Sequence, residues 1–168
     1  MVTAMARNGV NIGIRVSGLG DRWFTAPAAD VAGAYFPGFT AEDANKDIGD
    51  SAIMETGGIG GMAIATAPAI VRFLGAGRYQ DAVNYTNSMY EITLSEQDQY
   101  AMPDLDFRGS PIGIDILKVV ETGIAPIINT AIACKRPGVG MIGAGISKAP
   151  LAMFGEAMVA FAEAHGLQ

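Results

Sequence analysis

The densest group of polar side chains that could do chemistry lies in residues 15–25, where charged residues flank a Gly-x-Gly turn. The charged residues are Arg15, Asp21 and Arg22. An arginine can hold a carboxylate or a phosphate through two parallel hydrogen bonds, and glycines in the turn let the backbone approach a ligand closely. We predict that this segment binds a small anion. The alternative is a set of ion pairs that only fixes a long loop.

Acidic and amide side chains follow with a spacing that resembles the start of a calcium-binding loop. They are Asp43, Asn45, Asp47 and Asp50. An EF-hand needs glycine at the sixth position and glutamate at the twelfth, where this chain has Ile48 and Met54. We therefore predict no bound metal and no cofactor, with Mg²⁺ on these oxygens as an alternative. The remaining alternatives are a hydrogen-bond network for a polar substrate and an Asx-turn loop that satisfies its own backbone.

Glu55 precedes a glycine-rich run at residues 57–61. We predict that Glu55 acts as a general acid or base, and we group it with Asp47 and Asp50 as the catalytic candidates. Free N–H groups at a helix start bind anions, so Gly57 and Gly58 are candidates for holding a phosphate. The alternative is that these glycines serve tight helix packing.

Two later segments contribute further candidates. Arg108 lies in a polar loop and could hold a second anionic group, or it could form a structural ion pair. Asn129 interrupts an apolar run together with Thr130. These two side chains either point at a site or are satisfied inside the protein.

Other familiar patterns fail on inspection. The glycine run at residues 138–145 spells a dinucleotide fingerprint, but no helix starts at its last glycine and no suitable acid follows. Cys134 is predicted to be a small buried residue, and His165 to be solvated near the C-terminus. Without a nucleophile–histidine pair or a zinc ligand set, catalysis would rest on positioning and electrostatic stabilisation of a small anionic substrate.

These side chains must be positioned by a mixture of strands and helices. Apolar and polar residues alternate over residues 9–17, which predicts a strand, and residues 18–55 read as a long irregular region. We further predict helices over residues 59–74, 78–97 and 150–164, a strand over 127–133, and either type over 112–120. Because these elements show no clean βαβ alternation, we predict one α+β domain spanning residues 1–168. It would have a mixed sheet with packed helices and irregular polar loops forming the site.

The composition limits the possible partners. Hydrophobic residues make up 50% of the 168 positions and charged residues only 17%, so much of the surface should be hidden in an oligomer or against another domain. The net charge of −6 without a basic run argues against nucleic-acid or membrane binding. A single cysteine and the lack of a signal peptide or membrane-length apolar run predict a cytoplasmic protein.

Several long phrases of the chain resemble a known family when taken in order. They are IGIRVSGLGDRWFTAP (residues 12–27), YFPGFTAEDANKDIGDSAIMETGGIGG (35–61), MYEITL (89–94), LDFRGSPIGIDILKVVETG (105–123) and INTAIACKRPGVGMIGAG (128–145). Together they resemble the YlbE-like family of bacterial proteins, whose members include a subunit associated with oxamate carbamoyltransferase in allantoin breakdown. The resemblance implies an α+β fold, a cytoplasmic setting and partner subunits, one of them similar to acyl-CoA synthetases. Family members are much longer, and this chain resembles their C-terminal part.

The resemblance and the arginines together suggest a function. We expect a subunit of a carbamoyltransferase that acts on oxalurate or oxamate and carbamoyl phosphate in purine nitrogen catabolism. The alternatives are a non-catalytic assembly subunit and a metal-dependent hydrolase.

Overall fold

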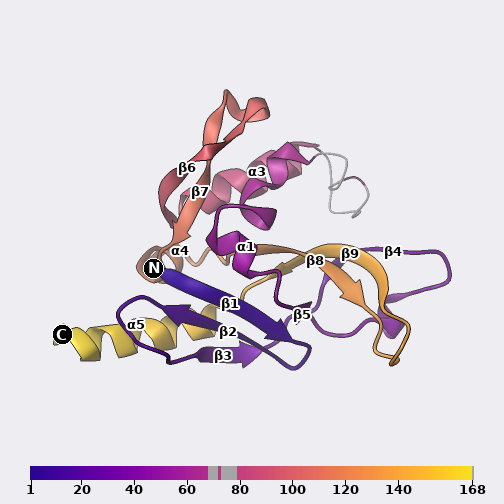
Figure 1. The fold of residues 1–168 in the computed structure, drawn as a ribbon, viewed down its shortest axis with the longest axis horizontal. Helices are drawn as coiled ribbons and strands as arrows, with labels where there is room; N and C mark the ends of the chain where they lie inside the picture. Colours follow the sequence, from indigo (N-terminus) through magenta and orange to yellow (C-terminus); the bar gives the residue numbers. More distant parts are fainter. Residues whose placement is uncertain (68–71, 73–78, 168) are drawn as a thin grey trace.

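The computed structural model describes residues 1–67, 72 and 79–167, and it has the predicted α+β architecture (Figure 1). Every strand pairing among these residues is antiparallel, and the strands form three separate sheets. The first sheet has the order β3-β2-β1-β5, the second β4-β9-β8, and the third is the hairpin β6-β7. In the part of the chain that is described, no helix is long and apolar enough to cross a membrane.

The first sheet is built by the N-terminal third of the chain. Its strands are β1 (Val2–Asn8), β2 (Asn11–Val16), β3 (Phe24–Pro27) and the short β5 (Ile48–Gly49). Strand β2 confirms the alternation seen in the sequence: Ile12, Ile14 and Val16 are buried, and Arg15 points to the opposite face. Strand β1 was not predicted. Its register shifts between Val2 and Ala4 in the pairing with β2, which breaks the two-residue period of its side chains.

The second sheet combines one N-terminal strand, β4, with two strands from the C-terminal part of the chain, and the hairpin comes from the middle of the chain. The second sheet contains β4 (Ala32–Tyr35), β8 (Ile127–Ala133) and β9 (Met141–Lys148), and the hairpin contains β6 (Thr93–Met102) and β7 (Arg108–Ile114). The predicted strand at residues 127–133 is confirmed. The glycine run at residues 138–145 enters β9 instead of opening a helix, and Gly145 pairs with Gly33 of β4 where a Cβ would meet backbone atoms.

The helices connect and cover the sheets. They are α1 (Ile53–Thr56), α3 (Tyr79–Tyr90), α4 (Ile116–Thr122) and α5 (Leu151–His165), with short 3₁₀ segments η1 (Ala41–Asp43), η2 (Gly60–Thr66) and η3 (Pro103–Leu105). Helix α4 begins where the Asp115 carboxylate accepts a hydrogen bond from Leu117 N at 2.9 Å, and it ends at Gly123 with φ +68°. The final helix starts after Pro150 as predicted.

Two predicted helices differ from the observed elements. The helix predicted over residues 78–97 ends at Tyr90, and strand β6 follows it from Thr93. The helix predicted over residues 59–74 is a 3₁₀ segment from Gly60 to Thr66, and most of its remainder lies outside the described residues. The ambiguous residues 112–120 contain both the end of β7 and most of α4.

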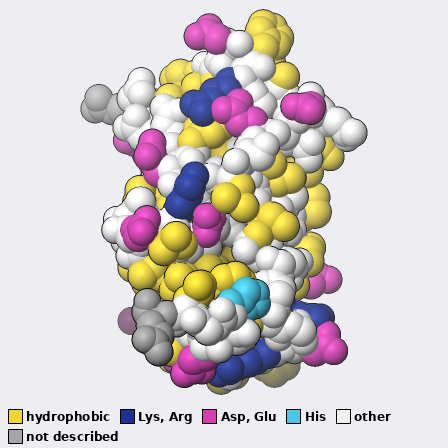
Figure 2. Space-filling model, turned by 90° about the vertical axis from the view of Figure 1, so that its left-hand side faces the viewer, with side chains coloured by type: hydrophobic (Ala, Val, Ile, Leu, Met, Phe, Trp, Pro, Cys, Tyr) yellow, Lys and Arg dark blue, Asp and Glu magenta, His cyan; other side chains and the backbone are white. Residues whose placement is uncertain are grey.

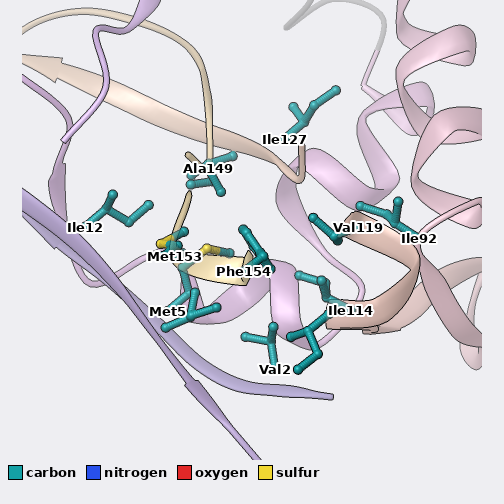
Figure 3. Packing of buried hydrophobic residues seen from close by; sticks show 14 of the residues in the cluster. Val2, Met5, Ile12, Ile92, Ile114, Val119, Ile127, Ala149, Met153 and Phe154 are labelled. Carbon is teal, nitrogen blue, oxygen red and sulfur yellow. The ribbon is translucent and has the colours of Figure 1, made fainter. Parts of the chain in front are cut away.

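The main core lies between the first sheet, α4 and α5. Figure 3 shows Met153 and Phe154 of α5 among Met5 and Ile12 of the sheet on one side and Val119 of α4 on the other. A smaller cluster of Val31, Ile132 and Ile142 lies on the second sheet. The junction between the first and second sheets is polar, and it contains the candidate site.

Candidate functional site

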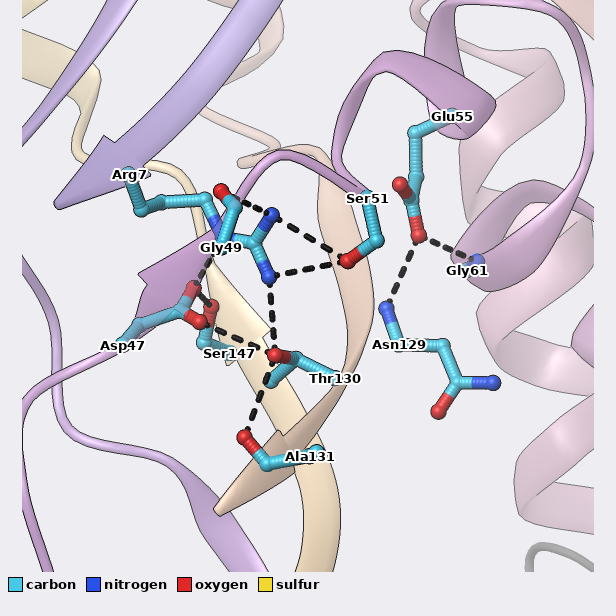
Figure 4. A network of polar contacts seen from close by, with 10 residues as sticks. All are labelled: Arg7, Asp47, Gly49, Ser51, Glu55, Gly61, Asn129, Thr130, Ala131 and Ser147. Carbon is cyan, nitrogen blue, oxygen red and sulfur yellow. Dashed lines mark hydrogen bonds and ion pairs between the residues drawn. The ribbon is translucent and has the colours of Figure 1, made fainter. Parts of the chain in front are cut away.

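A group of polar side chains fills the junction between the first and second sheets (Figure 4). We call it the polar centre, and it consists of Arg7, Asp47, Ser51, Thr130 and Ser147. They come from β1, from the loops on either side of β5, and from β8 and β9. The centre therefore joins segments that are up to 140 positions apart in the sequence.

Arg7 is the cation of the polar centre. Its side chain is fully buried, and its Nε lies 3.0 Å from Oδ2 of Asp47 in an ion pair, although this N–H is not aligned for a hydrogen bond. The Nη1 atom donates to Gly49 O at 2.9 Å, and Nη2 donates to Thr130 Oγ1 at 2.8 Å. Both Nη atoms also reach Ser51 Oγ, at 3.3 and 3.2 Å. These contacts replace the water that a buried guanidinium loses.

Asp47 has both carboxylate oxygens engaged inside the protein. The Thr130 hydroxyl donates to Oδ1 at 3.0 Å, and the Ser147 hydroxyl donates to Oδ2 at 2.5 Å. The residue is only 1% exposed. These contacts support a structural ion pair with Arg7, and a ligand could reach Asp47 only after the junction opened. The catalytic role assigned to Asp47 stays a prediction.

Glu55 lies beside the polar centre at the end of the short α1 and is 1% exposed. Its Oε1 accepts hydrogen bonds from Asn129 N at 2.9 Å and from Gly61 N at 3.0 Å, while its buried Oε2 has no hydrogen-bond partner. Burial raises the pKa of Glu55 above its ordinary value of 4.5, although the two backbone N–H groups and the charge of Arg7 act in the opposite direction. A carboxyl group with a raised pKa and a free oxygen is suited to proton transfer, although at 1% exposure a substrate could reach Glu55, like Asp47, only after the surrounding segments opened.

The glycine run after Glu55 is packed tightly and uses its N–H groups within the chain. Gly57 N donates to Met54 O at 3.0 Å, and Gly58 N donates to Glu55 O at 3.2 Å. A Cβ at Gly61 would lie 2.0 Å from the carbonyl oxygen of Ile127, so only glycine fits against β8. This supports the packing alternative, because the two glycines predicted to hold phosphate have their N–H groups occupied.

An open cavity of about 440 Å³ lies on the other side of this glycine run. Its wall includes Gly58, Ile59 and Thr66, and the facing wall comes from Gln99 and Tyr100 of β6. The volume is in the range of small-molecule sites. Its lining among the described residues consists of apolar and neutral polar side chains, so these residues give it the size for a small substrate but supply no charge for an anion.

Three further candidates lie around the polar centre. Asp50 is exposed, directly before Ser51. Asn45 is half-buried, and its amide nitrogen would lie 3.0 Å from a Cβ on Gly9 in the β1–β2 turn. Asn129 gives its backbone N–H to Glu55, but its side-chain amide points away from the polar centre (Figure 4).

The predicted arginine pair at residues 15 and 22 lies apart from the polar centre. Arg15 is on the outer face of the first sheet, where it forms an ion pair with the exposed Asp21 and donates to Gly20 O at 3.1 Å. Arg22 is exposed, with its guanidinium 4.7 Å from the ring centre of Phe24. Since Arg7 points inward from the same sheet, Arg15 and the polar centre occupy opposite faces.

Arg108 belongs to a third location. Its guanidinium forms an ion pair with Glu96 Oε1 at 2.7 Å and lies 3.5 Å from the ring centre of Tyr90. Arg108 begins β7 and Ile114 ends it. The seven residues of this strand place the two residues roughly 20 Å apart. The structure does not bring Arg108 together with Arg15 and Arg22, so the three arginines do not form one anion site.

Two members of the polar centre, Arg7 and Ser147, were missed in the sequence, whereas Asp47 was among the predicted residues. Arg7 lies in a strand whose alternation is broken, and Ser147 lies in a glycine-rich strand without a polar motif. Thr130 was predicted either to point at a site or to be satisfied inside the protein, and its hydroxyl lies between Arg7 and Asp47. The one available signal was a charged residue inside an otherwise apolar N-terminal segment. Among the described residues, no group of three or more histidine, cysteine or acidic side chains could hold a metal ion.

The chain is similar to known proteins, one of which carries a functional name. A family model described as oxamate carbamoyltransferase subunit AllG matches residues 1–51. The oxamate carbamoyltransferase subunit AllG of Escherichia coli (strain K12) is 54% identical over 167 residues, and the uncharacterized protein YahG of the same strain is 53% identical over 167 residues. These matches support the predicted link to such a subunit. The YlbE-like family name stays a prediction.

A solved structure shares the fold. It is the crystal structure of a conserved protein of unknown function from Enterococcus faecalis V583, with 55% sequence identity and a TM-score of 0.94 over 98% of this chain. The chain spans 40% of the AllG subunit, 35% of YahG and 39% of the Enterococcus protein. It therefore corresponds to well under half the length of each of these relatives.

Proposed function

We propose that this chain forms part of a subunit of a carbamoyltransferase-type enzyme. The substrates would be small carboxylates, oxalurate or oxamate, together with carbamoyl phosphate, in the catabolism of purine and allantoin nitrogen. The observation that carries the proposal is the 54% identity, over 99% of the chain, to a protein named as an oxamate carbamoyltransferase subunit. We further propose a cytoplasmic hetero-complex in which one partner subunit is similar to acyl-CoA synthetases.

Within this proposal, Glu55 is the residue assigned to proton transfer. Moving a carbamoyl group between phosphate and the oxamate nitrogen requires a proton to leave or reach that nitrogen. A carboxyl whose pKa is raised by burial and whose second oxygen has no hydrogen-bond partner is suited to exchanging this proton. Asp50 is the exposed carboxylate nearest in sequence to Ser51, and we assign it to orienting the substrate amide.

The test is carbamoyl transfer by the chain assembled with its partner subunits, comparing Glu55→Gln with wild type. Removing a general acid or base should lower kcat by about 10²–10⁴-fold with little change in KM. Glu156→Gln is the matched control because Glu156 is an exposed glutamate on α5, outside the site. Unchanged turnover by a folded Glu55→Gln complex would remove Glu55 from the reaction.

A second candidate is a non-catalytic assembly subunit. It is favoured by the placement of Arg15, Arg22 and Arg108 in separate surface contacts and of Asp47 in a buried ion pair. If this candidate holds, Arg22→Ala and Asp50→Asn should leave turnover per assembled complex unchanged. If the catalytic proposal holds, Asp50→Asn should lower turnover without lowering the yield of complex.

A further inference from the structure

The charged side chains that are buried among the described residues all lie at the junction of the first two sheets. They are Arg7, Asp47 and Glu55, which are 5%, 1% and 1% exposed. Figure 2 shows the usual placement of charge, with Lys and Arg in dark blue and Asp and Glu in magenta on the surface of the molecule. Well-packed apolar side chains often stabilise a fold as well as a buried ion pair does, so stability alone does not account for an arginine at this place.

The guanidinium of Arg7 joins two segments of the chain. Its Nη2 atom donates to Ser51 Oγ at 3.2 Å and to Thr130 Oγ1 at 2.8 Å. The Nη1 atom adds a second contact to Ser51 Oγ at 3.3 Å. Because the donors of a planar guanidinium point in fixed directions, these contacts hold the two hydroxyl groups in a fixed relation to each other.

Each of the two hydroxyl groups lies next in sequence to one half of a contact that Glu55 makes. Ser51 is two residues before α1, the short helix that carries Glu55. Thr130 directly follows Asn129, whose backbone N–H donates to Glu55 Oε1 at 2.9 Å. Figure 4 shows Arg7 reaching Ser51 and Thr130, with Glu55 and Asn129 beyond them. The bridge from Ser51 through Arg7 to Thr130 therefore spans the same two segments as the hydrogen bond between Asn129 and Glu55.

We propose that Arg7 is a positioning residue for Glu55: by holding Ser51 and Thr130 together, it keeps the Asn129 N–H on the Glu55 carboxylate. The inference rests on the proposed function, in which Glu55 exchanges the proton. Asp47 contributes indirectly, because its ion pair with Arg7 at 3.0 Å holds the guanidinium at the bridge.

The titration of Glu55 reports whether this contact is intact. The backbone N–H groups of Gly61 and Asn129 lower the pKa of Glu55, and the charge of Arg7 acts in the same direction, although the larger effect of burial keeps the pKa raised. If the Asn129 contact loosens, the charged form of Glu55 loses a charge-assisted hydrogen bond, and the pKa rises further.

Carbon-13 spectra of the carboxyl groups in the full chain measure this pKa without any substrate. Ser51→Ala and Thr130→Val each remove one end of the bridge and leave the charge of Arg7 in place. Each variant should raise the pKa of Glu55 by about 1 unit, as expected for partial loss of one charge-assisted hydrogen bond. The double variant should raise it no further than the single variants, because either change alone breaks the bridge. Thr130→Ser keeps the hydroxyl and should titrate like wild type.

Two further variants separate position from stability and from charge. Thr93→Val is the matched control for stability, because Thr93 is a buried threonine whose hydroxyl donates to Met89 O at 3.0 Å, outside the polar centre. It should lower the Tm and leave the titration of Glu55 unchanged. Arg7→Lys keeps the charge but replaces the planar fork by a single nitrogen on a flexible stem. It should raise the pKa of Glu55 as Thr130→Val does.

An unchanged titration of Glu55 in a folded Ser51→Ala or Thr130→Val chain would overturn the proposal and leave Arg7 with a purely structural role. An equal shift in Thr93→Val would also overturn it, because the pKa would then follow stability in general. If Thr130→Val does not fold, Ser51→Ala decides, since it changes only the loop before α1.

The proposed function is tested separately by the pH profile of kcat in the complex with the partner subunits. The limb of the profile that belongs to Glu55 should move to higher pH together with its pKa in Ser51→Ala. A shifted titration with an unshifted profile would remove Glu55 from the reaction and leave the positioning by Arg7 intact.

Discussion

At the scale of single residues, the two carboxylate oxygens of Glu55 lie in environments that have opposite effects on its pKa. Its Oε1 is held by two backbone N–H groups, which favours the charged form, while its Oε2 is buried without a partner, which favours the neutral form. Desolvation is the larger effect, so the pKa rises. Glu55 could be predicted as an acid or base from its position before the glycine run. Its burial could not, because the strand that encloses it lies more than 70 residues later in the sequence.

The raised pKa predicts how the stability of the chain depends on pH. A carboxyl whose pKa is higher in the folded state binds its proton more tightly there, so its contribution to stability is full below pH 4.5 and is lost as the pH rises through the folded pKa. Glu55→Gln cannot lose a proton, and its stability relative to wild type should therefore increase from pH 4 to pH 8. Each pKa unit by which Glu55 is raised on folding corresponds to about 1.4 kcal/mol of stability that wild type loses over this pH range.

Urea unfolding of both chains across this pH range measures the difference, with Glu156→Gln as an exposed control that should follow wild type. A Glu55→Gln chain that becomes relatively less stable as the pH rises would mean that the pKa of Glu55 is lowered in the folded state.

At the scale of elements, the local sequence was sufficient to predict a helix or strand where a single segment determines its own structure. Helix α5 begins after Pro150 and is mostly apolar, and β8 is a compact run rich in isoleucine, so the bounds of both elements were predicted to within one residue. Strand β6 was misassigned as the end of a helix because its exposed polar residues lack a two-residue period. Its structure comes from pairing with β7. The break in β1 likewise depends on its partner strand β2.

The contact between η2 and β8 provides a prediction at this scale. Gly61→Ala places a Cβ 2.0 Å from Ile127 O, so the segment must move away from β8 and weaken the Gly61 hydrogen bond to Glu55. Overpacking of this kind costs about 1–3 kcal/mol, and we expect a lower Tm. Gly57→Ala is the control in the same loop, because Gly57 has φ −92° and its Cβ would meet only an ordinary contact at 3.4 Å. Equal losses of Tm in the two variants would show that the close approach to β8 does not limit this position.

At the scale of the whole molecule, the polar centre is a polar connection between two sheets that also share apolar contacts. The main cluster includes Ile128 and Ile146 of the second sheet as well as residues of the first, and the cluster around Ile132 lies on the second sheet alone. Arg7 brings β1 of the first sheet into contact with Thr130 of the second, and Asp47 contacts both Arg7 and Ser147. Asp47 belongs to a pattern of acidic and amide residues that is visible in the sequence, but Arg7 and Ser147 belong to no motif. Only the arrangement of the sheets brings these residues together.

The ion pair at this junction gives the last prediction. Arg7→Met leaves the Asp47 carboxylate buried without its cation, and breaking a buried pair in this way costs about 3–5 kcal/mol. Asp47→Asn added to Arg7→Met removes the uncompensated charge, so the double variant should be more stable than Arg7→Met alone by at least about 1 kcal/mol. Arg22→Met, at an exposed arginine, should change the free energy of unfolding by less than about 1 kcal/mol. Urea unfolding measures wild type, the single variants Arg7→Met and Asp47→Asn, the double variant and the Arg22→Met control. Strictly additive losses from Arg7→Met and Asp47→Asn would contradict the assignment of these two residues as a coupled pair at the junction of the sheets.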